Sequence, residues 1–101
     1  MLVNVVFDEE EHVFDIINVP SFVANDIENV QQMFFSWLYD EESNNHNYWK
    51  FTNGLKSCAY GTEEFVDWIN NVHLVNETGE KAKIIKKFPN KLDNNIPTIY
   101  F

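Results

Sequence analysis

A regular spacing of apolar side chains between residues 23 and 38 restricts the fold of this chain more than any other feature. Apolar residues recur there at alternating steps of four and three positions: Val23, Ile27, Val30, Phe34 and Trp37. That spacing places them on one face of an α-helix. We therefore predict a helix over residues 25–40, with Asn25 at its N-cap and the side chain of Glu28 reaching back to it in a capping box. The face that carries Trp37 should be buried beneath the rest of the chain.

Two predicted strands precede this helix. Residues 2–7 and 12–19 are rich in β-branched and aromatic side chains, which is typical of strands. Four consecutive acids at residues 8–11 separate them, so we predict an antiparallel hairpin with an acidic loop. Pro20 has no backbone N–H to donate to a neighbouring strand, and the second strand should end there.

A second hairpin is predicted from the dipeptide Asn53-Gly54, because both residues adopt positive φ readily and form two-residue turns between strands. The turn would join strands over residues 48–52 and 55–60. One face of this hairpin carries side chains that we expect to pack against the long helix: Trp49, Phe51, Cys58 and Tyr60.

A second helix is predicted over residues 62–73. Thr62 is a suitable N-cap, and Glu63 and Glu64 would lie in the first turn, where the helix dipole favours acids. Trp68 belongs to the apolar face of this helix and should be buried.

The last part of the chain is ambiguous. Residues 80–88 contain good helix formers, so we predict a short helix there. The alternative is a strand in which Ala82 and Ile84 face inward. Residues 98–101 are predicted to form a last short strand after Pro97.

Together these elements predict a small α+β fold in a single domain over residues 1–101. Its mainly antiparallel sheet would be built from the two hairpins, with helices 25–40 and 62–73 packed on one face and a short C-terminal helix and strand. The single cysteine, Cys58, excludes an intrachain disulfide. No apolar stretch reaches the ~20 residues of a membrane span. We therefore expect a cytoplasmic protein that does not bind membranes.

The charge of the chain is acidic and unevenly distributed. The net charge is −9, with fifteen acids against two lysines in residues 1–80 and five lysines against one acid in residues 81–101. The sequence contains no arginine, which is the residue that supplies a planar fork for bidentate phosphate contacts. This composition argues against direct nucleic-acid binding and favours a basic protein partner.

The sequence contains no recognisable catalytic motif. GxSxG, P-loop and GxGxxG patterns are all absent. The three histidines, His12, His46 and His73, lack the spacing of a zinc site. We therefore expect no catalytic residue, no metal site and no cofactor.

Two runs of acids are candidate partner-binding residues. The first run is Asp8, Glu9, Glu10 and Glu11, and the second is Asp40, Glu41 and Glu42. The second run follows the C-terminal end of the predicted long helix, where anions oppose the helix dipole. Both runs could equally be solvated loop charges that serve solubility.

Phe35 and Tyr39 complete the candidate site. They lie one helical turn apart and off the main apolar face of the predicted helix. On the solvent side they would form an aromatic anchor beside the acids of residues 40–42, as protein interfaces often have. The alternative is that both belong to the core on a wide helix face.

In size and acidity the chain resembles two broad groups of small inhibitors: phage anti-defence proteins, which include anti-CRISPR proteins, and the immunity proteins of bacterial toxins. The resemblance is one of composition. It implies a non-enzymatic inhibitor that binds a basic surface of another protein, such as a surface that holds nucleic acid. A toxin immunity protein, a small carboxylate-dependent enzyme and an assembly subunit are the alternatives. The sequence does not decide whether the protein forms homo-oligomers.

Overall fold

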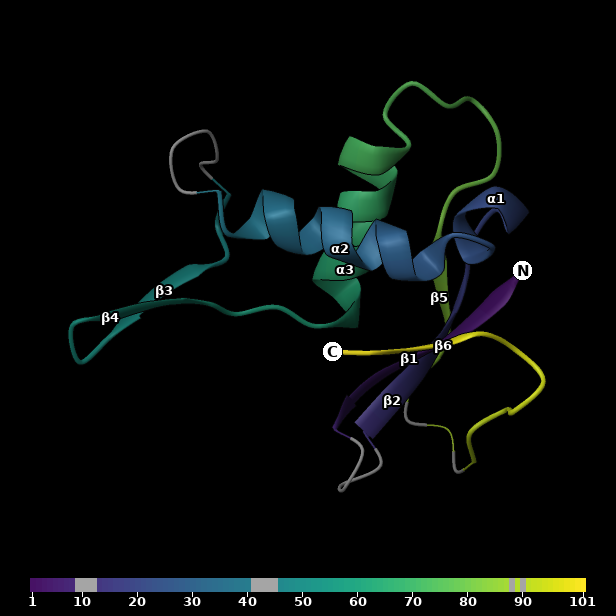
Figure 1. Cartoon of the computed structure of the whole chain (residues 1–101), viewed down its shortest axis with the longest axis horizontal. Helices are drawn as coiled ribbons and strands as arrows, with labels where there is room; N and C mark the ends of the chain where they lie inside the picture. The colour runs from purple at the N-terminus through teal and green to yellow at the C-terminus, as the bar shows by residue number, and fades with distance from the viewer. Residues whose placement is uncertain (9–12, 41–45, 88, 90) are drawn as a thin grey trace.

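The computed structural model describes residues 1–8, 13–40, 46–87, 89 and 91–101. Its helices and strands, labelled in Figure 1, follow one another in this order: β1 (Leu2–Asp8), β2 (Val13–Asn18), α1 (Ser21–Ala24), α2 (Ile27–Leu38), β3 (Trp49–Thr52), β4 (Leu55–Cys58), α3 (Thr62–Trp68), a π-helical segment (Ile69–His73), β5 (Lys83–Lys87) and β6 (Thr98–Tyr100). The predicted α+β class is confirmed.

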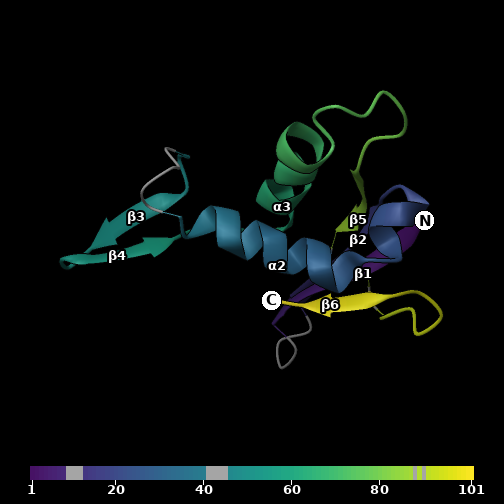
Figure 2. The ribbon, with the colours of Figure 1, turned by 45° about the horizontal axis from the view of Figure 1, so that its top comes forward.

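The main sheet has four strands in the order β5-β2-β1-β6. β1 and β2 form the predicted antiparallel hairpin, in which Leu2 lies opposite Asn18. β6 runs parallel to β1 on its other edge. Helices α2 and α3 lie on the same side of this sheet, with α2 crossing it (Figure 2).

The predicted helix over residues 80–88 is wrong, because this segment contains strand β5, which pairs antiparallel with β2. Ala82 is buried and Ile84 packs against the core, as the alternative assignment required. The hydrogen-bonding edge of β2 therefore overrides the weak helix preference of the local sequence. Lysines along the exposed β5 are a common protection of an edge strand.

The second hairpin has the predicted turn and register. Asn53 and Gly54 have φ angles of 52° and 78°, and Phe51 lies opposite Lys56. However, β3 and β4 form a separate two-stranded sheet, so the prediction of one sheet built from both hairpins is wrong. The hairpin projects from the far end of α2, beyond the main sheet (Figure 1).

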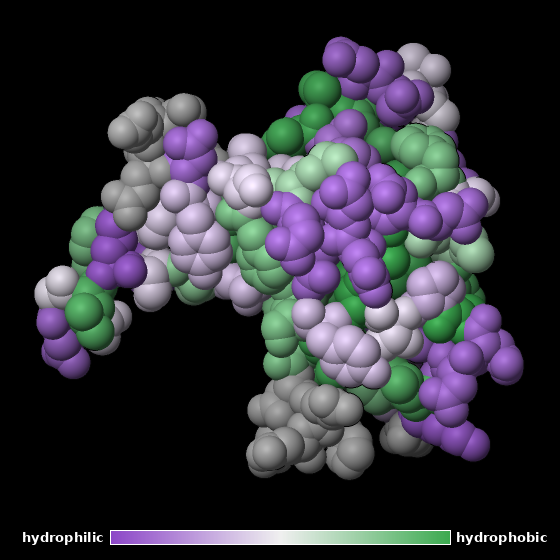
Figure 3. Space-filling view, viewed as in Figure 1, coloured by the Kyte–Doolittle hydropathy of each residue, from purple (hydrophilic) through white to green (hydrophobic). Residues whose placement is uncertain are grey.

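The prediction that this hairpin packs its apolar face on the long helix is also wrong for its outer half. Phe51 is 73% exposed, whereas Trp49, Cys58 and Tyr60 are half-buried. Phe51 is exposed because the hairpin begins beyond the end of α2. The base of the hairpin therefore reaches the core, whereas its tip does not. In the space-filling view the hairpin stands clear of the body (Figure 3).

The N-caps of both main helices differ from those predicted, although α3 begins at Thr62 as expected. Asn25 ends the short helix α1, and Asp26 is the N-cap of α2, so the capping box of Asn25 with Glu28 is not formed. Gly61 rather than Thr62 is the N-cap of α3. The Glu64 carboxylate accepts a hydrogen bond from the Gly61 N–H at 3.2 Å, which satisfies one of the unpaired donors at this helix end.

The core is centred on the ring of Phe34, which is fully buried. Six other rings have centroids between 5.2 and 6.3 Å from it: Phe35, Trp37, Tyr60, Phe65, Trp68 and Phe101. Trp68 is 4% exposed, which confirms its predicted burial. Trp37 is only half-buried and packs against the edge of the core.

A buried polar residue fixes the place of β6. The side-chain amide of Asn4, on β1, donates hydrogen bonds to the Asp93 carbonyl at 2.7 Å and to the Thr98 hydroxyl at 3.0 Å. The Asn4 backbone N–H donates to the Pro97 carbonyl at 2.8 Å. These bonds hold the segment before β6 on the sheet and set the parallel register.

We expect Gly54→Val to weaken the β3–β4 hairpin locally. A β-branched residue in the left-handed region costs about 1–2 kcal/mol, and the hairpin can open without the main sheet. Amide hydrogen exchange should therefore accelerate in β3 and β4 while the denaturation midpoint moves little. Gly79→Val is the matched control, because Gly79 lies in open space without a positive φ. Equal exchange in the two variants would contradict the turn geometry.

The two tryptophans of the helices should differ in their contribution to stability. We expect Trp68→Ala to lower the free energy of unfolding by about 3–5 kcal/mol, because it leaves a cavity beside Phe34. Trp37→Ala should cost clearly less, since part of this side chain is already in solvent. Urea denaturation measures both values, and a larger loss for Trp37→Ala would contradict the described core.

Candidate protein-binding site

Helix α2 ends in a pair of exposed residues beside the base of the hairpin. Tyr39, the C-cap of α2, is 52% exposed, and Asp40 follows it. The Tyr39 ring meets the Trp49 ring edge-on, with centroids 6.0 Å apart. We call Tyr39, Asp40 and Trp49 the α2-end surface.

His46 fastens the start of the hairpin to the end of α2. Its Nδ1 accepts a hydrogen bond from the Tyr48 backbone N–H at 3.1 Å. Because that N–H can only donate, the ring proton lies on Nε2, which donates to the Leu38 carbonyl at 2.7 Å. The Leu38 carbonyl is one of the acceptors that a helix leaves unpaired at its C-terminus. This bridge therefore completes the helix end and orients the hairpin.

Stacked rings add to this attachment. The His46 ring lies 4.8 Å from the Trp37 ring and 5.3 Å from the Trp49 ring, measured between centroids. The Cys58 thiol, on the neighbouring strand, also donates to the Leu38 carbonyl at 3.6 Å. Hydrogen bonds and ring contacts thus attach the α2-end surface to the base of the hairpin.

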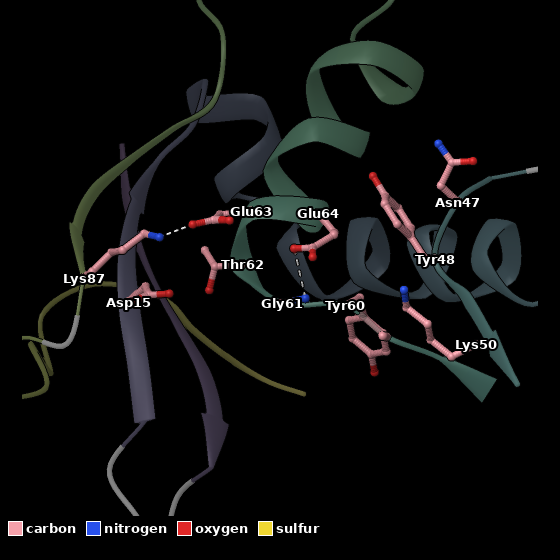
Figure 4. Close-up of a pocket in the computed structure, with 11 residues that line it drawn as sticks. Asp15, Asn47, Tyr48, Lys50, Tyr60, Gly61, Thr62, Glu63, Glu64 and Lys87 are labelled. Carbon is pink, nitrogen blue, oxygen red and sulfur yellow. Dashed lines mark hydrogen bonds and ion pairs between the residues drawn. The ribbon is translucent and has the colours of Figure 1, made fainter. Parts of the chain in front are cut away.

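A cleft of about 520 Å³ separates the base of the hairpin from α3 and the main sheet (Figure 4). Its titratable lining groups come from four elements and the segments between them: Asp15, Tyr48, Lys50, Tyr60, Glu63, Glu64 and Lys87. We call this the hairpin cleft. On one side Lys87 forms an exposed ion pair with Glu63.

The two tyrosines of the hairpin cleft have raised pKa values, mainly because of burial. Burial raises the pKa of Tyr48, and the nearby charges of Asp67 and Glu64 raise it further. Burial is also the main cause of the raised pKa of Tyr60. The environment of the Tyr48 hydroxyl is therefore negative. Among the described residues, the buried hydroxyl of Thr62, which lines the same cleft, has no hydrogen-bond partner.

The structure separates the residues of the predicted partner-binding site. Tyr39 and Asp40 lie together at the exposed end of α2. Phe35 instead packs its ring between Tyr60 and Phe101, with centroids at 6.1 and 5.5 Å. It belongs to the edge of the core, which was the alternative assignment, so the predicted exposed pair of Phe35 with Tyr39 is not formed.

The acid runs are described only at their ends. Asp8 ends strand β1. Glu9, Glu10, Glu11, Glu41 and Glu42 lie outside the described residues.

Sequence reasoning missed the exposed tip of the hairpin. Phe51 and Leu55 flank the turn and are each 73% exposed. Phe51 was predicted to be buried because of its apolar character, and Leu55 was assigned to no surface. The lysines of the hairpin were the better sign of exposure. Lys50 and Lys56, both on this hairpin, are the two lysines of residues 1–80.

The described residues were compared with the requirements of a metal site and of a membrane span. Within them, no cluster of three or more histidines, cysteines or acids is placed to hold a metal ion. None of the helices in the described ranges combines the length and apolar character needed to cross a bilayer. Comparison of the chain with protein-family models, with curated proteins and with solved structures found no match.

Proposed function

We propose that this protein is a non-enzymatic inhibitor that binds a basic surface of another protein, of the kind that normally holds nucleic acid. The observation that supports the proposal is the α2-end surface, where the exposed Tyr39 contacts the Trp49 ring and is followed by the exposed Asp40. Exposed aromatic anchors with a charged rim are typical of protein interfaces.

The charge of the chain determines the kind of partner. Residues 1–80 carry fifteen acids against two lysines, and Glu41 and Glu42 continue the acid run after Asp40. Carboxylates at the end of a helix can take the positions that phosphates occupy on a basic surface. The surrounding negative field would attract such a partner from a distance and accelerate association.

A basic toxin that the protein neutralises would be a partner of the same chemistry. An assembly subunit is the second candidate function, because the exposed Phe51 and Leu55 of the hairpin tip need a covering surface. That possibility concerns a different part of the molecule from the α2-end surface.

Neutralising the acid run at the end of α2 should slow partner association. The first step is to capture proteins from the source cell on the immobilised chain and identify a basic, stoichiometric partner. The variant Asp40→Asn/Glu41→Gln/Glu42→Gln should then associate about tenfold more slowly at low ionic strength, with a weaker dependence on salt. Stopped-flow mixing at several salt concentrations measures both quantities.

The matched control is Glu28→Gln/Glu77→Gln/Glu80→Gln, which removes the same charge at exposed positions elsewhere. Nucleic acid should compete for the partner without binding this chain. If both triple variants associate at the same rate, net charge alone matters and the site at the end of α2 is wrong.

A further inference from the structure

We propose that two copies of this chain form a dimer in which the hairpin tip of each copy docks against the hairpin cleft of the other. The hairpin tip consists of Phe51, Leu55 and Lys56, around the Asn53-Gly54 turn. This inference goes beyond the proposed inhibitor function, and the tip adjoins the α2-end surface through Trp49, on whose ring Lys56 lies.

The exposed apolar surface of the tip requires a cover. Phe51 and Leu55 are each 73% exposed. The hairpin that carries them extends away from the body (Figures 1 and 3). An isolated two-stranded hairpin is at best marginally stable in water. Because Phe51 lies opposite Lys56 and Leu55 lies opposite Thr52, these two side chains stand on opposite faces of the hairpin, so the tip exposes a large apolar side chain on each face.

The charge of the tip identifies what covers it. The Lys56 ammonium lies 4.3 Å from the centroid of the Trp49 ring and 5.9 Å from that of Phe51, so the tip presents a cation on an aromatic base. A basic partner would be repelled by this group. An acidic surface suits it, and the rest of residues 1–80 is strongly acidic. A second copy of this chain therefore has the complementary charge.

The hairpin cleft provides a suitable receptor. Its lining includes three carboxylates, two ammonium groups and two tyrosine rings: Asp15, Glu63, Glu64, Lys50, Lys87, Tyr48 and Tyr60. The carboxylates outnumber the lysines, so the cleft is acidic on balance. Figure 4 shows Glu64, Tyr48 and Tyr60 around the same space. Carboxylates beside aromatic rings bind an ammonium group through charge and through the ring faces. Burial is the main cause of the raised pKa of Tyr48, and the charges of Asp67 and Glu64, which add to it, would also favour a bound cation.

The position of the cleft fits a reciprocal arrangement. It opens at the base of the same hairpin whose tip is exposed, so a two-fold axis beside the hairpins can place each tip at the other cleft. Both contacts are then identical, as in the isologous interfaces of most dimers. The two hairpins would run antiparallel, which also allows the strand edges of the small sheet to pair.

Sedimentation equilibrium of the full chain tests the proposal. A dimer with a micromolar Kd is largely formed at a concentration of about 100 μM. We therefore expect a mass of twice 12.0 kDa at that concentration. Phe51→Asp should raise the Kd by about tenfold or more. Val75→Asp is the matched control, because Val75 is an exposed apolar residue outside the hairpin. A monomer at all concentrations, or equal Kd values for the two variants, would overturn the proposal.

A charge exchange between copies locates the contact. Lys56→Glu and Glu64→Lys should each weaken self-association by about tenfold, because each places like charges together. An equimolar mixture of the two variants should form heterodimers with near-native affinity, since both contacts again join opposite charges. A mixture that stays monomeric would overturn the assignment of the cleft. If Glu64→Lys disturbs α3, the comparison of Phe51→Asp with Val75→Asp still decides whether the tip forms the interface.

Discussion

The packing of aromatic rings around Phe34 holds together parts of the chain that are far apart in sequence. α2 supplies Phe34 itself, α3 supplies Phe65 and Trp68, and Phe101 follows β6. Edge-to-face ring contacts such as these each add about 0.5–1.5 kcal/mol to the gain from apolar burial. Phe101 also stacks on Phe7 of β1 with centroids 4.7 Å apart, which joins the cluster to the main sheet. Phe34 is thus the ring that both helices and the C-terminal strand segment share.

The same cluster explains why the molecule has a rigid body and an outlying hairpin. Tyr60, just after β4, packs on Phe34 with centroids 5.6 Å apart and connects the hairpin to the core. His46 provides a second attachment at the end of α2. Beyond these two points the hairpin is exposed, so it keeps its orientation at the base while its tip is available for contact. Binding elements commonly combine a fixed base with an accessible tip.

Sequence patterns predicted the features that depend on neighbouring residues. Asn53 and Gly54 set a turn and a register by their own backbone preferences, and the face of α2 followed from the spacing around Phe34. Features set by distant partners were missed. Ile84 and Ile85 among lysines suit a helix or an edge strand, and only the free edge of β2 decides between them. The sequence also left open whether Phe35 is exposed or buried, because its neighbours Tyr60 and Phe101 come from remote segments. Of the candidate site, the exposed end of α2 could be predicted, whereas the hairpin cleft arises from tertiary packing.

The parallel pairing of β1 with β6 has a consequence for the protein during its synthesis. The Asn4 side-chain N–H groups and the second edge of β1 find their partners only once the chain has been made as far as Thr98, 94 residues further along. At typical ribosomal speeds that interval is about 5–20 seconds. Throughout it, the nascent chain exposes an unpaired strand edge flanked by Val3 and Val5, which are completely buried in the finished fold. Such an edge is a site for chaperone binding and for mispairing between neighbouring nascent chains, so the rate of translation bears directly on the yield of native protein.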